Sequence, residues 1–338
     1  MEERPTPRQM AKALLNGVAP PRPLFLPIVF SLGAKVENVS LDSFLSNPAK
    51  ISSALRQMRG HLGADGVACY FDPYLEMEAL GATLQRHLQG RSPTIHWAQP
   101  ARAGEMPGSL RSPEEAAKSG RVPVGVEVIR RMNALPNRDF LLMAGVAGPL
   151  TLAARLTQWS ESADLPDDAL ELAGSVVTQV ASTFVEAGAD VMVIEETVFP
   201  ASSGRGFDSW ADLLAPLINI VRFYEAVPVL QLNASQPLHE NGDAIFQRQW
   251  DCVVSLPLEN PVQERRTEAK RKNIAMLGIA LPLDAFGSAG QGGEDLHRGL
   301  QQMILELRPA LVTTAGDVPA TTDMKILGKV FREVARAL

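Results

Sequence analysis

Short apolar runs without helical periodicity alternate along this chain with longer stretches whose apolar residues recur every three or four positions. Apolar runs of about four to eight residues are typical of buried strands, and the longer spacing is typical of amphipathic helices. The pattern predicts strands at residues 24–30, 66–71, 140–144, 191–194, 228–232, 251–255, 274–277 and 310–313. It predicts helices at residues 6–15, 47–62, 124–135, 167–187, 210–226, 239–249, 262–272, 294–307 and 323–337.

Because a strand followed by a helix recurs about eight times, we expect an α/β fold with a parallel sheet. Eight such units predict closure into a (β/α)8 TIM barrel, formed by a single domain that spans residues 1–338. Residues 1–22 are expected to form an N-terminal helix and a proline-rich linker. Residues 81–123, after the second strand, are predicted to be a long irregular loop that acts as a lid or binding loop.

Composition and charge narrow the classes of partner. The net charge of −6 disfavours nucleic acid, because nucleic-acid-binding surfaces are usually basic. The first residues lack the apolar segment of a signal peptide, and no uncharged apolar run approaches the length of a membrane span. The two cysteines form no C-x-x-C pair. We therefore expect a cytoplasmic protein that binds a small molecule and contacts neither nucleic acid nor membrane.

In a (β/α)8 barrel, the residues at the C-terminal ends of the strands form the active site. The predicted strand ends carry mainly carboxylates, amides and small residues: Ser31, Asp72, residues 145–148, Glu195, Glu196, Gln231, Asn233, Ser255, Thr314, Gly316 and Asp317. Carboxylates in such a set indicate acid–base chemistry. The predicted catalytic group is Asp72 together with Glu195 or Glu196. Repulsion between two such carboxylates would raise the pKa of one of them, which would then keep its proton and act as a proton donor.

These assignments have structural alternatives. Asp72 could instead cap a loop, and one of Glu195 and Glu196 is expected to face the mouth while the other forms a surface pair. Gly148-Pro149 lies where a helix begins, so its N–H groups could hold an anionic group, or it could form a tight turn. No histidine follows a strand, which disfavours a Ser-His-Asp triad, and no Cys or His pair has zinc-ligand spacing.

Five segments, taken in order, resemble the uroporphyrinogen decarboxylase superfamily, which also contains cobalamin-linked methyltransferases acting on methanol, methylamines and aryl methyl ethers. They are residues 63–72 (GADGVACYFD), 145–153 (GVAGPLTLA), 186–194 (EAGADVMVI), 228–233 (PVLQLN) and 316–323 (GDVPATTD). Together they run through nearly the whole chain. The resemblance implies the same barrel fold.

The chain departs from the decarboxylases of this superfamily at two places. Their arginine-bearing run after the first strand, which holds substrate carboxylates, corresponds here to residues 27–33 (PIVFSLG), which contain no arginine. Their late catalytic histidine is absent from residues 313–317 (TTAGD), whereas their pyrrole-contacting aspartate matches Asp72. Because a tetrapyrrole with many carboxylates needs cationic partners, the resemblance favours the methyltransferase branch.

Zinc-dependent methyltransferases of that branch hold the metal with a His-x-Cys and a late cysteine, which correspond here to Gln231, Asn233 and Gly316. The resemblance therefore implies no metal site, and two amides that hydrogen-bond a substrate or a pterin-like heterocycle. It implies a methyltransferase or demethylase with no tightly bound cofactor, which moves a methyl group from a small methylated or methoxylated substrate to a corrinoid protein or tetrahydrofolate. Any cobalamin would be carried by that partner. The predicted catalytic residues are Asp72, Glu195 and Glu196, and the predicted substrate-binding residues are Ser31, Tyr70, Tyr74, His96, Gly148, Gln231, Asn233 and Asp317.

Two other functions remain open. A decarboxylase of uroporphyrinogen or another aromatic or tetrapyrrole acid is supported by Asp72 and opposed by the missing arginines. A non-catalytic binding partner of a methyltransferase complex is favoured by the loss of all three metal ligands. The additional N-terminal helix is compatible with a homodimer.

Overall fold

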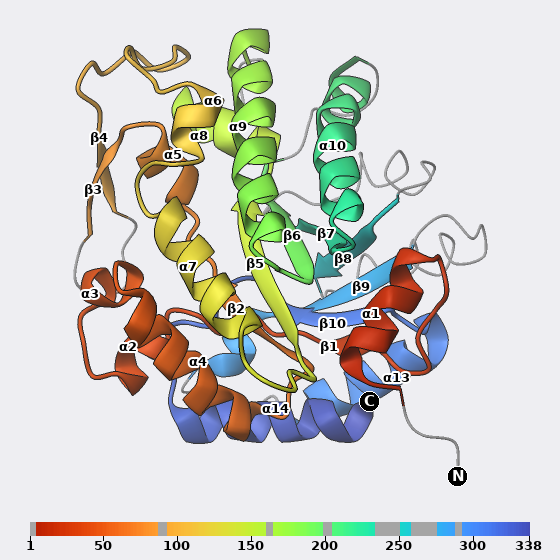
Figure 1. Cartoon of the computed structure of the whole chain (residues 1–338). Helices are drawn as coiled ribbons and strands as arrows, with labels where there is room; N and C mark the ends of the chain where they lie inside the picture. Colours follow the sequence, from red (N-terminus) through yellow and green to blue (C-terminus); the bar gives the residue numbers. More distant parts are fainter. Residues whose placement is uncertain are drawn as a thin grey trace.

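The computed structural model describes residues 5–86, 93–159, 165–198, 205–233, 251–257, 276–287 and 293–338. Parallel strands form a sheet that curls into a barrel (Figure 1). The strand order is β1 (Leu24–Phe25), β10 (Leu311–Thr314), β9 (Met276–Leu281), β8 (Val253–Pro257), β7 (Val227–Leu232), β6 (Val191–Glu196), β5 (Leu141–Ala147) and β2 (Gly66–Tyr70). The first two strands of this sheet in the sequence, β1 and β2, lie at the two ends of this series.

The two ends of this series meet through Asp65, the residue before β2. Its backbone N–H donates to the Phe25 carbonyl at 2.9 Å, and its carboxylate accepts from the Phe25 N–H at 2.8 Å. Arg22 in turn donates to both oxygens of that carboxylate at 2.7 Å. The contacts join the first strand to the second, and the predicted (β/α)8 barrel is confirmed.

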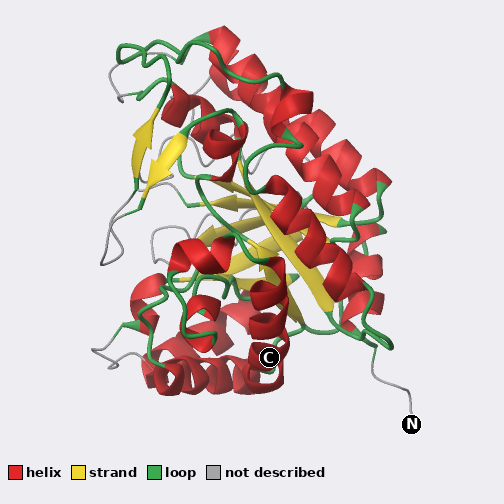
Figure 2. Ribbon diagram, turned by 60° about the vertical axis from the view of Figure 1, so that its left-hand side comes forward, coloured by secondary structure: helices red, strands yellow, loops and turns green. Residues whose placement is uncertain are grey.

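Helices surround the sheet (Figure 2). The longer ones are α1 (Pro7–Leu15), α4 (Pro48–Leu62), α7 (Val122–Asn133), α8 (Pro149–Leu156), α9 (Asp167–Glu186), α10 (Arg205–Phe223), α13 (Gly293–Leu307) and α14 (Met324–Ala337). Shorter ones are α2 (Gly33–Val36), α3 (Leu41–Leu45), α5 (Leu75–Ala79), α6 (Pro113–Ala116) and the 3₁₀ turn η3 (Leu283–Phe286). The helices expected at residues 239–249 and 262–272 lie outside the described residues.

Local sequence explains where α4 begins and ends. The Asn47 side chain accepts from the N–H groups of Ala49 and Lys50, and Pro48 occupies the first helical position, where its missing N–H is not needed. The helix ends at Gly63, whose φ of 61° is a left-handed conformation that glycine adopts without strain. Ile51, Leu55 and Met58 then lie on the buried face of the helix. Among the described helices, none combines the length and apolar character that a membrane span requires.

Residues 81–123 are only partly irregular, so that prediction is corrected. β3 (Thr83–Gln85) pairs antiparallel with β4 (Thr94–His96), and α6 follows. Leu84 in β3 and Ile95 in β4 are each less exposed than their two neighbours. This alternation is only three residues long, so it could not be recognised in the sequence among the surrounding polar residues. Strand ends also shift: β5 continues to Ala147 and β6 to Glu196, so Gly145, Glu195 and Glu196 lie within strands.

Candidate active site

The polar strand-end residues are brought together by the register of neighbouring strands. Ala147 on β5 pairs with Glu195 on β6, Glu195 pairs with Gln231 on β7, and Gln231 pairs with Ser255 on β8. Gln231 and Ser255 are fully buried. Since paired residues of parallel strands project to the same face, these side chains form one polar row near the C-terminal ends of the strands.

Glu195, a member of this row, is hydrogen-bonded to Asn233, which follows β7. The Asn233 Nδ2 donates to Glu195 Oε1 at 2.8 Å and to the Ala315 carbonyl at 2.6 Å. Burial raises the pKa of Glu195, while the hydrogen bond from Asn233 and the positive charge of Arg155 oppose that rise. A carboxyl in these surroundings can hold a proton at a higher pH than an exposed glutamate.

Three buried oxygens in this region have no hydrogen-bond partner among the described residues: Gln231 Oε1, Asn233 Oδ1 and Ser255 Oγ. The amide nitrogen of Gln231 is satisfied, because it donates to the Thr314 carbonyl at 3.1 Å. Unpaired buried acceptors are unfavourable, so a group that donates hydrogen bonds to them would be stabilising.

These residues do not fit zinc. Gln231 and Asn233 offer neutral amides, and Gly316 offers no side chain; a Cβ there would lie 3.9 Å from Glu195 Oε1. The described part of the chain contains no group of three His, Cys, Asp or Glu side chains placed to hold a metal. The amide and hydroxyl oxygens suit hydrogen bonding rather than thiolate or imidazole coordination of zinc.

Glu196 points the opposite way from Glu195 and is fully buried, so neither glutamate forms the expected surface pair. Its carboxylate accepts from the N–H groups of Leu150 at 3.1 Å and Thr151 at 2.8 Å. It also accepts from the Thr151 hydroxyl at 2.6 Å and the Trp210 Nε1 at 2.9 Å. Burial, opposed by these hydrogen bonds, raises the pKa of Glu196 to about 7.

These contacts place a carboxylate of the protein itself at the N-terminus of α8. Gly148 caps that helix, and a Cβ at this position would overlap with the Glu196 carboxylate. The N–H groups of Leu150 and Thr151 therefore bond Glu196, and the Gly148 N–H donates to the Glu195 carbonyl at 2.7 Å, so these three N–H groups already have partners within the protein.

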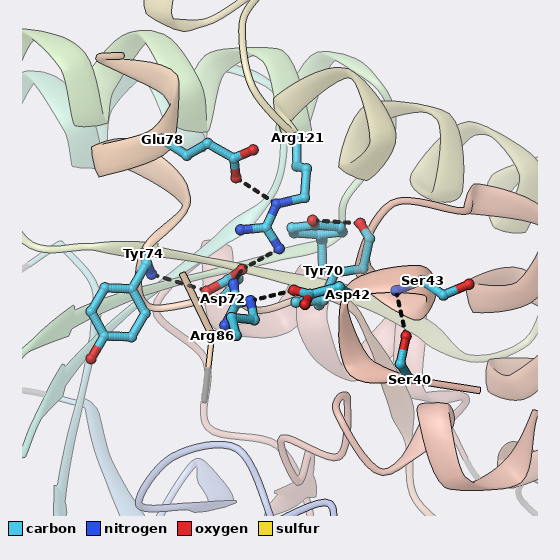
Figure 3. Close-up of polar contacts among 10 residues, drawn as sticks. Ser40, Asp42, Ser43, Tyr70, Asp72, Tyr74, Glu78, Arg86 and Arg121 are labelled. Carbon is cyan, nitrogen blue, oxygen red and sulfur yellow. Dashed lines mark hydrogen bonds and ion pairs between the residues drawn. The ribbon is translucent and has the colours of Figure 1, made fainter. Parts of the chain in front are cut away.

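Asp72 lies two residues after the end of β2, at the centre of an ion-pair cluster (Figure 3). Its side chain is only 2% exposed, and its Oδ2 is 2.7 Å from both Arg86 and Arg121. Its Oδ1 accepts from the Tyr74 N–H at 3.0 Å. The sequence predicted that Asp72 would act together with Glu195 or Glu196. In the structure, its carboxylate pairs with two arginines instead.

Each of the two arginines has a second carboxylate partner. Arg86, which follows β3, is 3.1 Å from Asp42 of α3, and Arg121, at the start of α7, pairs with Glu78 of α5. The cluster therefore ties the β3–β4 hairpin and two short helices to the end of β2 (Figure 3).

The remaining predicted substrate-binding residues fall in three places. Tyr70 is fully buried, its ring packs against Phe30, and its hydroxyl donates to the Leu45 carbonyl at 2.9 Å. His96 is exposed on β4. Ser31 and Asp317 join the loops after β1 and β10.

In that junction, the Asp317 carboxylate accepts from the N–H groups of Phe30 at 2.8 Å and Ser31 at 2.9 Å. Burial raises the pKa of Asp317 to about 7. The roles assigned to Ser31, Tyr70, His96 and Asp317 in substrate binding stay predictions.

Four charged residues of this region were not predicted from the sequence: Glu76, Arg86, Arg121 and Arg155. Glu76 of α5 is fully buried; its Oε1 accepts from the Ala147 N–H at 3.1 Å, and its Oε2 has no partner among the described residues. Burial raises the pKa of Glu76 to about 7. The sequence signal that could have identified Glu76 is its position shortly after Asp72-Pro73. A residue so close to the end of one strand can reach the end of the neighbouring strand.

A separate cleft of about 800 Å³ lies at the opposite, N-terminal end of the strands. Residues of α1, Arg138, Asp190 and Arg222 line it, and Arg138 and Asp190 form an ion pair with each other. Since active sites of this fold lie at the C-terminal ends of the strands, the polar row and its neighbours are the better candidate.

A family model described as Uroporphyrinogen decarboxylase (URO-D) matches residues 6–218, and the chain belongs to this family. Among curated proteins, it is similar to the methylcobamide:CoM methyltransferase MtaA of Methanosarcina barkeri, with 28% identity over 131 residues. That match covers 36% of this chain and 37% of the relative, so the chain spans little more than a third of the curated relatives it matches.

Solved structures show the same fold along more of the chain. A methyltransferase from Methanosarcina mazei has a TM-score of 0.75, with 18% identity and coverage of 98% of each chain. A B12-independent methionine synthase from Shewanella sp. W3-18-1 has a TM-score of 0.51, with 14% identity and coverage of 88% of each chain. At these identities the similarity establishes the fold.

Proposed function

We propose that this chain is a methyltransferase without a zinc site, which moves a methyl group from a small methylated or methoxylated substrate to a corrinoid protein or to tetrahydrofolate. The observation that carries the proposal is the Glu195–Asn233 pair, joined at 2.8 Å at the C-terminal ends of the strands, beside amide oxygens that no described residue bonds. The similarity to a methylcobamide:CoM methyltransferase supports methyl transfer and a corrinoid partner.

In this proposal, Glu195 supplies the proton that the leaving group needs. The acceptor contributes the electron pair that forms the new bond to the methyl carbon, and the electrons of the broken C–O or C–N bond go to the leaving atom. A carboxyl whose pKa is raised by burial can protonate that atom as the bond breaks. Asn233 holds this carboxyl in position, and Gln231 and Asn233 offer the amide oxygens that no described residue bonds to N–H or O–H donors of the substrate or acceptor.

Asp72 has a positioning role in this proposal. Its two arginines and the Tyr74 N–H already occupy both carboxylate oxygens, so it orders the residues around the mouth. The same observation argues against uroporphyrinogen decarboxylation, in which the matching aspartate would have to accept hydrogen bonds from pyrrole nitrogens.

The test supplies reduced free cobalamin or tetrahydrofolate with methanol, methylamines and methoxylated aromatic compounds, and follows methylated acceptor by absorbance and chromatography. We expect at least one donor to react with the wild-type protein, and Glu195→Gln to lower the rate about 100-fold, the typical contribution of a general acid. Glu127→Gln, on the exposed face of α7, is the matched control with an unchanged rate. If no donor methylates either acceptor, and anaerobic uroporphyrinogen yields partly decarboxylated products, the decarboxylase function replaces this proposal.

A further inference from the structure

Three arginines contact the loop that follows β2, Arg86 and Arg121 at Asp72 and Arg155 at Pro73, and they differ in how their charge is compensated. Arg86 and Arg121 each pair with two carboxylates. Arg155 of α8 forms no ion pair with any described carboxylate, and its single hydrogen bond to a described residue runs from Nη1 to the backbone carbonyl of Pro73. Arg155 is therefore the one member of this trio whose charge the described residues leave uncompensated.

The carboxyls near Arg155 do not neutralise it. The Arg155 charge acts on both Glu76 and Glu195, yet burial raises the pKa of each of these groups. Since the pKa of Glu76 is raised to about 7, its carboxyl carries less than a full negative charge near neutral pH. A half-buried guanidinium in such surroundings favours an external anion, because its own solvation is reduced and its neighbours provide little compensation.

The orientation of Arg155 selects the shape of that anion. The Pro73 carbonyl holds Nη1, and the guanidinium carbon lies 5.6 Å from the centre of the Tyr74 ring. The edge that carries Nε–H and Nη2–H makes no hydrogen bond with the described residues. These two N–H groups are parallel and match the two oxygens of a carboxylate.

We propose that Arg155 binds a carboxylate of the substrate through its Nε and Nη2 edge, so that the methyl donor is a methylated or methoxylated carboxylic acid. That the bound carboxylic acid is a methyl donor rests on the proposed function. The carboxylate site itself is defined by Arg155 and its contacts with Pro73 and Tyr74. It lies apart from the first-strand segment, residues 27–33, which contains no arginine.

The proposed carboxylate site is related to the Glu195–Asn233 pair through Ala147. Ala147 donates its N–H to Glu76 of α5 and pairs with Glu195 of β6, so it connects the two carboxyls on which the Arg155 charge acts. A substrate anchored by its carboxylate at Arg155 would extend its methyl-bearing end toward the Glu195–Asn233 pair. Arg155 is in this account a specificity-determining residue.

The test measures binding without any methyl acceptor, so its outcome does not depend on whether methyl transfer is detected. Titration calorimetry compares acetate, methoxyacetate and 4-methoxybenzoate, each with its neutral amide, on wild-type protein, Arg155→Gln, Arg155→Lys and Arg131→Gln. Arg131 is an exposed arginine paired with Glu127 on α7 and serves as the matched control. Thermal unfolding of every variant checks that the fold is retained.

We expect the wild type to bind at least one carboxylate tenfold or more tightly than its amide, and Arg155→Gln to abolish that preference. Arg155→Lys should keep a weaker preference, because an ammonium group retains the charge but not the two parallel N–H donors. Arg131→Gln should behave as the wild type. Equal affinity for each carboxylate and its amide in the wild type, or an undiminished preference in folded Arg155→Gln, would overturn the assignment.

Discussion

Glu76 makes the stability of this protein depend on pH in a direction that can be worked out from the structure. Its carboxyl is fully buried, with one oxygen bonded to the Ala147 N–H and the other without a partner among the described residues. Burial raises its pKa from 4.5 to about 7, against smaller opposing effects of backbone N–H groups and Arg155. The folded protein therefore keeps a proton that the unfolded chain has already released between pH 4.5 and 7.

Because the native state binds more protons in this interval, the free energy of unfolding falls as the pH rises. A difference of one pKa unit corresponds to about 1.4 kcal/mol. A rise from 4.5 to about 7 therefore predicts a loss of about 2.5 kcal/mol between pH 5 and pH 8 from Glu76 alone. Glu196 and Asp317, whose pKa values burial also raises to about 7, act in the same direction.

The substitution Glu76→Gln isolates this contribution, because glutamine has nearly the same shape and does not titrate. Urea unfolding of the wild type and the variant at pH 5 and pH 8 gives four free energies. Relative to the wild type, Glu76→Gln should gain about 2.5 kcal/mol on going from pH 5 to pH 8. Any pH-independent effect of the buried amide cancels in this comparison.

Glu127→Gln provides the control, since Glu127 is exposed on α7 and pairs with Arg131. An exposed pair of this kind contributes less than about 1 kcal/mol, and the control should follow the wild type at both pH values. The reasoning is refuted if Glu76→Gln and the wild type lose equal stability between pH 5 and pH 8.

The other predictions concern the carboxylates and close contacts of the same region. Glu196→Ala leaves several buried donors unpaired and should lower the free energy of unfolding by about 3–5 kcal/mol, measured by urea denaturation at pH 8; a loss below about 1 kcal/mol would contradict the buried contacts. Gly145→Ala places a methyl group against the Phe71 ring and should cost about 1–3 kcal/mol, and an unchanged thermal midpoint would show that the ring moves freely. Asn233→Ala should slow methyl transfer about tenfold or more through the loss of its hydrogen bond to Glu195, with a shift in the pH–rate profile, whereas an unaltered profile would separate Asn233 from Glu195.

The barrel could be predicted from the sequence because its strands are apolar runs long enough to be recognised without tertiary information. Val191–Glu196 illustrates the limit of this approach: the run predicted the strand, but its two final glutamates were placed after the strand rather than in it. Alternation along the strand then sends Glu195 toward Asn233 and Glu196 toward the start of α8. The sequence predicted that the two glutamates would differ in role but did not indicate which of them faces the mouth.

The arginines of the site could not be predicted because their partners are distant in sequence. Arg86 follows a short hairpin strand, and Arg121 and Arg155 begin or lie within helices, where a charged residue ordinarily faces solvent. Packing of α7 and the hairpin brings Arg86 and Arg121 to Asp72. The absence of arginine from residues 27–33 therefore did not mean that the mouth lacks cationic groups.

The central claim is methyl transfer at the Glu195–Asn233 pair, and isotope tracing in a single turnover tests it most directly. Wild-type protein in excess over acceptor is mixed with methoxylated carboxylic acids, methanol or methylamines that carry a ¹³C-labelled methyl group, together with reduced cobalamin or tetrahydrofolate. The account predicts a ¹³C resonance from the methylated acceptor in at least one mixture, formed about 100-fold more slowly by Glu195→Gln. Labelled methyl groups that remain on every donor, or an equal rate with Glu195→Gln, would contradict it.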